Sequence, residues 1–156
     1  MEAQIHPVRY DHPDVVMMTA EVQAEYARRY GDGGDVSPIS PVEFLPPDGR
    51  FVVAYVDDFP AAMGGWRRGG PDGSTDAEVK RMYVRPGHAR RGLARLVLAE
   101  LERTAAAAGV TRLVLETGTA QPEAIALYES SGFEHISAFG FYADYDDSVH
   151  LAKALG

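Results

Sequence analysis

The chain has 156 residues, of which 46% are hydrophobic and 24% charged. These values are typical of a globular protein, and we expect one domain, residues 1–156. It has no cysteine, which excludes disulfides and thiolate chemistry, and its net charge of −8 argues against a nucleic-acid partner. It also lacks a secretory pattern and the apolar run of about 20 residues that spans a membrane, so we expect a cytoplasmic protein without a membrane partner.

The hydrophobic pattern predicts strands and helices in the order β, α, ββ, β, α, β, α, β, β. In chain order these are a strand at 5–10, a helix at 11–30 ending at Gly31, a hairpin at 50–56 and 59–68, a strand at 77–84, a helix at 90–108, a strand at 110–117, a helix at 121–131, and strands at 133–142 and 148–155. The stretch 31–49 is rich in Gly, Pro and Asp and predicts a long loop, which often forms the wall of a binding site. One helix joins the strands at 77–84 and 110–117, so we expect a mixed α/β domain in which they are parallel.

Positive charge gathers around the start of the predicted helix at 90–108. Between Val79 and Ala99 there are six basic residues and no acidic one. No Ser, Thr, Asp or Asn stands there to cap the helix, so its first backbone N–H groups are open to an anion such as phosphate. Gly92 and Ala94 keep this turn small, and Arg90, Arg91 and Arg95 add guanidinium groups suited to phosphate. The alternative is a solvated, charged helix face. The apolar side of this helix is predicted to comprise Leu93, Leu96, Val97, Leu101, Ala105 and Ala108, with Gly109 as its stop.

Two blocks of this sequence resemble the GNAT N-acetyltransferase superfamily. The run "ARRGLA" is similar to the family signature [Q/R]-x-x-G-x-[G/A], with Ala89 where Gln or Arg is usual. The run "QPEAIALYESSGF" resembles the family pattern Asn-x-x-Ala-x-x-x-Tyr-x-x-x-Gly-Phe, with Gln121 in place of Asn. The two blocks flank a strand, and the resemblance covers about Ala77 to Phe133.

The resemblance implies a mixed, mostly antiparallel sheet with helices on both faces. Its parallel fourth and fifth strands would splay apart around acetyl-CoA, and a bulge in the fourth would free its backbone for the pantetheine arm. The pyrophosphate would lie on residues 89–95. The implied cofactor-binding residues are Met82, Tyr83, Val84, Ala89, Arg90, Arg91, Gly92, Leu93, Ala94, Arg95 and Gln121. No metal is expected, because the five histidines show no ligand spacing.

Three residues are candidates for proton transfer. By its place in the second block, Tyr128 would protonate the departing thiolate; the alternative is a tyrosine whose ring simply packs on its helix. Glu78 is a candidate general base by resemblance, and the alternative is a strand residue paired with Lys80. Glu116, at the end of the next strand, is another candidate base or amine-binding carboxylate, and ordered water could replace both.

The acceptor pocket is expected between residues 43–49 and 139–147. Its predicted apolar walls are Phe44, Phe139, Phe141 and Tyr142, and Asp144, Asp146 and Asp147 would either attract a cationic amine or form a solvated loop. The predicted function is direct transfer of an acetyl group from acetyl-CoA to a primary amine of a small molecule or peptide. A hydroxyl acceptor, a longer acyl donor and a homodimer stay open. The alternative function is a non-catalytic acyl-CoA-binding module of the same fold.

Overall fold

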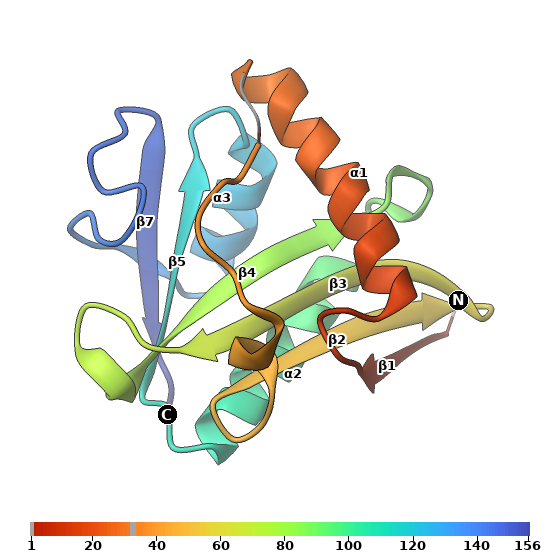
Figure 1. Cartoon of the computed structure of the whole chain (residues 1–156), viewed down its shortest axis with the longest axis horizontal. Helices are drawn as coiled ribbons and strands as arrows, with labels where there is room; N and C mark the ends of the chain where they lie inside the picture. Colours follow the sequence, from red (N-terminus) through yellow and green to blue (C-terminus); the bar gives the residue numbers. More distant parts are fainter. Residues whose placement is uncertain (1, 32–33) are drawn as a thin grey trace.

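Seven strands form one mixed sheet in the computed structural model, which describes residues 2–31 and 34–156 (Figure 1). The strand order is β1-β2-β3-β4-β5-β7-β6. The strands are β1 Ala3–Pro7, β2 Gly49–Val56, β3 Phe59–Arg68, β4 Asp76–Val84, β5 Arg112–Gly118, β6 Glu134–His135 and β7 Ser148–Ala154, and the helices are α1 Pro13–Tyr30, α2 Leu93–Ala107 and α3 Pro122–Ser130. This order and the parallel pairing of β4 with β5 confirm the prediction. No helix in the described ranges is long and apolar enough to cross a membrane.

Helices cover both faces of the sheet, as predicted. Helix α1 lies on one face, where Val15, Met18 and Val22 pack against sheet residues such as Phe51 (Figure 1). Helices α2 and α3 cover the other face and contribute to the larger hydrophobic cluster. Burial of both apolar faces fixes the register of the strands, because a slip by one residue would turn each side chain to the wrong side.

Local sequence explains where α1 begins and ends. The His12 ring accepts a hydrogen bond from the backbone N–H of Asp14 at 3.0 Å, and Pro13 stands in the first turn, where its missing N–H costs nothing. The helix ends at Gly31, whose φ of 70° is left-handed and favours glycine. The predicted end of this helix is confirmed.

Three predicted elements differ from the structure. The strand predicted at 5–10 is β1 Ala3–Pro7, because only these five of the described residues pair with β2. Helix α2 begins at Leu93 rather than at residue 90, because Arg90 and Gly92 have φ angles of 64° and 75°, outside a right-handed helix. The predicted apolar face of α2 is confirmed for Leu93, Val97, Leu101 and Ala105, whereas Leu96 is 41% exposed and Leu98 is buried in its place. The strand predicted at 133–142 is only Glu134–His135, because just these two residues pair with β7.

Strands β4 and β5 pair over only three positions and then separate. The pairs are Asp76 with Arg112, Ala77 with Leu113 and Glu78 with Val114, and beyond them the strands diverge (Figure 1). This splay confirms the prediction and leaves the far half of β4 without a partner on its β5 side.

The expected bulge in β4 is also present. On β3, Met63 pairs with Tyr83 and Gly65 pairs with Lys80, so two residues of β4 oppose Gly64 alone. Arg81 takes the left-handed φ of 61° at this point. Because the bulge interrupts the alternation of side chains, the neighbours Lys80 and Arg81 both reach Asp35, in the loop after α1.

Candidate functional site

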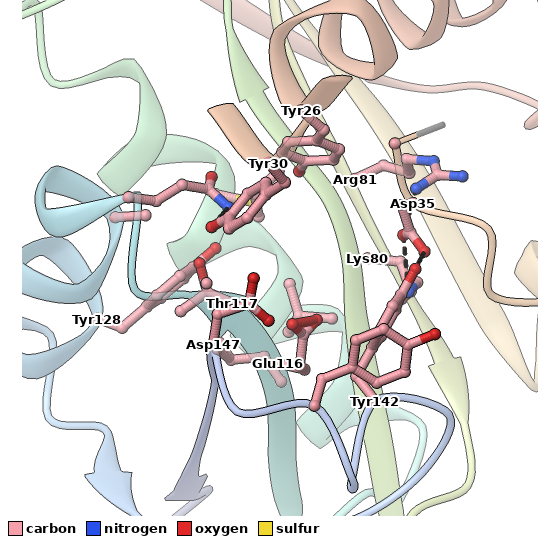
Figure 2. Close-up of a pocket in the computed structure, with 18 residues that line it drawn as sticks. Tyr26, Tyr30, Asp35, Lys80, Arg81, Glu116, Thr117, Tyr128, Tyr142 and Asp147 are labelled. Carbon is pink, nitrogen blue, oxygen red and sulfur yellow. Dashed lines mark hydrogen bonds and ion pairs between the residues drawn. The ribbon is translucent and has the colours of Figure 1, made fainter. Parts of the chain in front are cut away.

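A cavity opens where β4 and β5 separate, and we name it the inter-strand cavity (Figure 2). Both strands, helices α1 and α3, and the loops before β2 and β7 contribute to it. It is lined by Tyr26, Tyr30, Gly34, Asp35, Val79, Lys80, Arg81, Met82, Leu115, Glu116, Thr117, Gly118, Gln121, Ala124, Tyr128, Tyr142, Tyr145 and Asp147. The splay therefore brings ionisable groups from distant parts of the chain into one enclosed space.

Glu116 on β5 is the carboxylate with the most unusual environment in this cavity. Within residues 2–31 and 34–156, the structure gives its side chain no hydrogen-bond or ion-pair partner. Burial raises the pKa of Glu116 to about 7; the positive charge of Lys80 opposes this rise and the negative charge of Asp35 adds to it. A carboxylate with a pKa near neutrality can take up and release a proton, which is what a general base must do.

Tyr128 on α3 lines the same cavity. Its ring is buried and packs edge-on against Phe133, with ring centroids 5.5 Å apart. Burial raises the pKa of Tyr128 above its usual value, and the charge of Glu116 adds to the rise, so the hydroxyl stays protonated at neutral pH. In the described part of the chain no group hydrogen-bonds this hydroxyl, which leaves its proton free for a reacting group.

Asp35 forms the centre of a buried polar network at the edge of the cavity (Figure 2). Its carboxylate accepts hydrogen bonds from Lys80 Nζ at 3.1 Å and from the Tyr142 hydroxyl at 2.6 Å, and it also pairs with Arg81. Ser37 Oγ donates to the same carboxylate at 2.6 Å. This network joins the loop after α1 to β4 and to the loop before β7.

The start of α2 offers backbone donors to an anion. Gly92 precedes the helix with a left-handed φ of 75°, and no side chain caps this end. The first hydrogen bond of the helix runs from Leu96 N to Gly92 O at 3.1 Å, so the N–H groups of Leu93 to Arg95 have no acceptor within the helix. A Cβ atom at Gly92 would meet nothing within 4 Å, so the backbone here is open to a ligand. These residues fit a phosphate group.

A model of the acetyltransferase (GNAT) family matches residues 17–133 of this sequence. The chain is 31% identical over 153 residues to YjgM of Escherichia coli, an uncharacterised N-acetyltransferase, a match that covers 93% of this chain and 90% of that protein. The chain belongs to the GNAT acetyltransferase family. Its fold is also that of a Klebsiella pneumoniae protein described as an acyl-CoA N-acyltransferase, with a TM-score of 0.81, 24% identity, and coverage of 99% of this chain and 98% of the other.

A shorter match links this GNAT protein to an IAA acetyltransferase of Azospirillum brasilense, at 41% identity over 78 residues. The match covers 50% of this chain and 51% of that relative, so the chain spans about half the length of this curated protein. The family assignment supports an acyltransferase fold, and GNAT folds generally bind acetyl-CoA or another acyl-CoA. In the described ranges, no group of three or more His, Asp or Glu side chains is arranged to hold a metal ion.

Glu78 lies beside the cavity, in a neighbouring pocket that we name the loop pocket. The residues that line it are Ser37, Pro38, Glu43, Arg67, Arg68, Gly69, Gly70, Pro71, Glu78, Lys80, Glu116, Phe139, Gly140, Phe141 and Tyr142. Arg67 on β3 binds Glu78 Oε1 through Nε at 3.1 Å and Nη2 at 2.8 Å. The alternative given for Glu78, a pairing with Lys80, is therefore wrong, because Arg67 stands directly opposite Glu78 in the sheet and Lys80 pairs with Asp35.

The expected acceptor walls are only partly in place. Phe139, Phe141 and Tyr142 line the loop pocket. Phe44 does not, because it is buried in the core and stacks on Tyr10 with ring centroids 5.0 Å apart. Of the three predicted aspartates, Asp147 lines the inter-strand cavity, whereas Asp144 and Asp146 line neither pocket.

The basic residues around the GNAT signature divide into two groups. Lys80 and Arg81 share Asp35, and Arg85 pairs with Glu21 on α1 at 3.1 Å, so two carboxylates bind these three cations. Arg95 donates to the Ser130 hydroxyl at 2.7 Å and thereby links α2 to the end of α3. Arg90 and Arg91 are exposed at the turn before α2. The local excess of positive charge therefore has a structural use as well as a place beside the anion site.

The other predicted cofactor residues lie around the splayed strands. Met82 lines the inter-strand cavity, whereas the Tyr83 hydroxyl points to the opposite face and donates to Glu21 at 3.0 Å. Val84 packs against the larger core cluster. Gln121 lines the cavity and its amide donates to the Tyr30 hydroxyl at 3.2 Å.

Sequence reasoning did not identify Asp35, Tyr26 or Tyr30 as site residues. Asp35 lies in the predicted loop, and the sequence indicated a binding site there only through the length of that loop. Tyr26 and Tyr30 are one turn apart on α1, a spacing that predicted only a packed helix face. Their partners are far away in sequence: Asp35 meets Lys80 across 45 residues, and Tyr30 meets Gln121 across 91.

Proposed function

We propose that this GNAT-family protein transfers an acetyl group directly from acetyl-CoA to a primary amine of a small molecule or peptide. The observation that carries the proposal is the presence in one cavity of two groups without a hydrogen-bond partner among the described residues: Glu116, whose pKa is raised to about 7, and Tyr128, which stays protonated. They come from β5 and α3, on the side of the gap that faces β4. A protein that only bound acyl-CoA would need neither group.

The donor would bind at the residues that the family motif indicates. The pyrophosphate would meet the backbone N–H groups of residues 89–95 at the start of α2, near Arg90 and Arg91. The pantetheine arm would pair with β4 around Met82, where the splay leaves the backbone without a strand partner. The thioester would then lie near Glu116 and Tyr128.

In the reaction, the neutral amine nitrogen attacks the thioester carbonyl carbon and forms the new C–N bond. Glu116 accepts a proton from the nitrogen, directly or through one water molecule. The C–S bond breaks as the tetrahedral intermediate collapses, and Tyr128 gives its proton to the sulfur. We assign the base role to Glu116 rather than Glu78, because Arg67 holds an oxygen of Glu78 in two hydrogen bonds.

The acceptor would enter through the loop pocket, which Glu116 and Lys80 also line. All the cations of this pocket are engaged: Arg67 binds Glu78 and Glu43, Arg68 binds Asp48, and Lys80 binds Asp35. The unpaired charge of Glu116 would therefore favour an acceptor that arrives as an ammonium ion, which releases one proton to water before its neutral form attacks.

A panel of primary amines, with detection of free thiol and of the acetylated product by mass, tests the proposal. We expect thiol release from acetyl-CoA that depends on the acceptor and a product heavier by one acetyl group. Thiol release that no amine stimulates, together with normal acetyl-CoA binding, would contradict it and favour the acyl-CoA-binding module. Alcohols and longer acyl-CoA donors in the same panel test the remaining acceptor and donor classes.

A further inference from the structure

We propose that Asp35 is a positioning residue that holds the ammonium group of Lys80 away from Glu116 and thereby keeps the Glu116 carboxylate unpaired. The consequence for catalysis rests on the proposed function, in which Glu116 is the base. The role of Asp35 in holding Lys80 does not depend on that function.

Lys80 is the cation best placed to neutralise Glu116. Both residues line the inter-strand cavity and the loop pocket, so they face the same space. Lys80 is only 8% exposed, and a buried ammonium group requires an anionic partner. In the structure that partner is Asp35, at 3.1 Å, with a second hydrogen bond to Ser37 Oγ at 2.9 Å. Figure 2 shows Lys80 beside Asp35 and Tyr142, with Glu116 across from them on β5.

Asp35 is itself held in place from several directions. The Tyr142 hydroxyl donates to its carboxylate at 2.6 Å, and its backbone N–H donates to Gln23 Oε1 on α1 at 2.7 Å. Burial alone would raise the pKa of Asp35, but Lys80, the hydrogen bonds from Ser37 and Tyr142, and Arg81 bring that pKa below its usual range. Asp35 therefore carries a full negative charge at neutral pH, and its oxygens are fixed toward Lys80.

Among residues 2–31 and 34–156, the remaining groups around Glu116 do not supply another free cation. Glu78 on β4 and Asp147 in the loop before β7 are both acidic and raise its pKa further. Tyr128 on α3 is neutral, and burial lowers the pKa of His150, which stands opposite Glu116 on β7, so this ring is neutral at pH 7.

The nearby guanidinium groups are also engaged. Arg81 binds Asp35 and the Tyr10 hydroxyl, and Arg67 binds Glu78. Without the Asp35 carboxylate, the flexible Lys80 side chain would face the unpaired Glu116 carboxylate, with which it shares both pockets. An ion pair between them would hold Glu116 in its ionised, weakly basic form.

Carbon-13 NMR titration of the Glu116 carboxyl, assigned with Glu116→Gln, tests this inference without an activity assay. We expect Asp35→Asn to lower the pKa of Glu116 by about 1–3 pH units, as for a carboxylate that gains an adjacent cation. Loss of the Asp35 charge alone would also lower it. Asp35→Asn is therefore also made in a Lys80→Met background. If the effect depends on Lys80, we expect the fall in the Glu116 pKa there to be less than about half of that in the wild-type background.

Ser37→Ala serves as a second variant, because Asp35→Asn could leave Lys80 and Arg81 unpaired and prevent folding. It removes one hydrogen bond from the ammonium group without changing any charge, and we expect a smaller fall in the Glu116 pKa. The inference is overturned if Asp35→Asn acts equally in both backgrounds, or if Ser37→Ala leaves the titration unchanged. If Glu116→Gln were fully active while these shifts appeared, the base assignment would fail and the role of Asp35 toward Lys80 would stand.

Discussion

At the scale of single residues, the site depends on two groups with opposite protonation needs. Burial raises the pKa of both Glu116 and Tyr128, but the consequences differ because their usual values differ. Glu116 moves to about 7, where it exchanges protons, and Tyr128 moves further from neutrality, where it keeps its proton. Burial in one cavity therefore prepares a base and an acid.

Replacing Tyr128 with Phe removes the proposed acid while keeping the ring that packs against Phe133. We expect kcat to fall by about 10²- to 10⁴-fold with nearly unchanged acetyl-CoA affinity, because the hydroxyl acts only on the departing sulfur. Steady-state kinetics and calorimetry measure the two quantities. Tyr145→Phe is the matched control, since Tyr145 also lines the cavity but is 48% exposed. Turnover equal to wild type between about pH 6 and 9 would remove Tyr128 as the acid.

At the scale of elements, the start of α2 combines a backbone turn with an uncapped helix. Arg90 and Gly92 are both left-handed, and this turn delays the helix by three residues relative to the sequence prediction. Backbone geometry, more than arginine charge, makes the proposed phosphate site.

Gly92→Glu tests this element against a control with the same backbone. Gly92 and Gly73 both have a φ of 75° and nothing within 4 Å of an added Cβ, so each substitution carries similar strain, about 1–2 kcal/mol. Only the carboxylate at position 92 would face the phosphates. We expect calorimetry to show no acetyl-CoA binding by Gly92→Glu and normal binding by Gly73→Glu. Equal affinity in both variants would contradict the phosphate site.

At the scale of the whole molecule, the sequence correctly predicted the features that a short segment of the chain determines by itself. The order of strands and helices follows from local periodicity, and the two motif blocks locate Gly92 and Tyr128. The splay and bulge of β4 came from the family resemblance rather than from periodicity. Phe44 shows the limit: its place in a loop suggested a pocket wall, but tertiary packing buries it beside Tyr10.

The charge network could not be read from the sequence, because it joins segments that are distant in the chain. Asp35 lies 45 residues from Lys80 and 107 from Tyr142, and no local pattern reports such contacts. The same holds for Glu78, whose partner Arg67 follows from the register of β3 with β4. An acidic chain with one basic segment thus folds so that two carboxylates, Asp35 and Glu21, pair with three of the basic residues of that segment.

The central claim is that Glu116 is the base of an amine acetyltransferase, and the pH dependence of kcat/KM at saturating acetyl-CoA tests it most directly. A base must be deprotonated to act, so its protonation should lower the wild-type value by roughly tenfold per pH unit below a pKa of about 7. A lysine-like acceptor amine, with a pKa near about 10, must also lose a proton before it attacks, and this adds a constant fall of about tenfold per pH unit below about pH 10 in wild type and variants alike. The Glu116 ionisation therefore appears as a further steepening of the pH profile near a pH of about 7.

Glu116→Gln should lower kcat/KM by about 10²- to 10⁴-fold and remove the part of the pH profile that reports an ionisation near pH 7, which we call the limb. Glu78→Gln should keep that limb. This result would assign the ionisation near pH 7 to Glu116, the unpaired carboxylate on β5. A Glu116→Gln enzyme with the wild-type rate and the same limb would contradict the account, as would loss of the limb in Glu78→Gln alone.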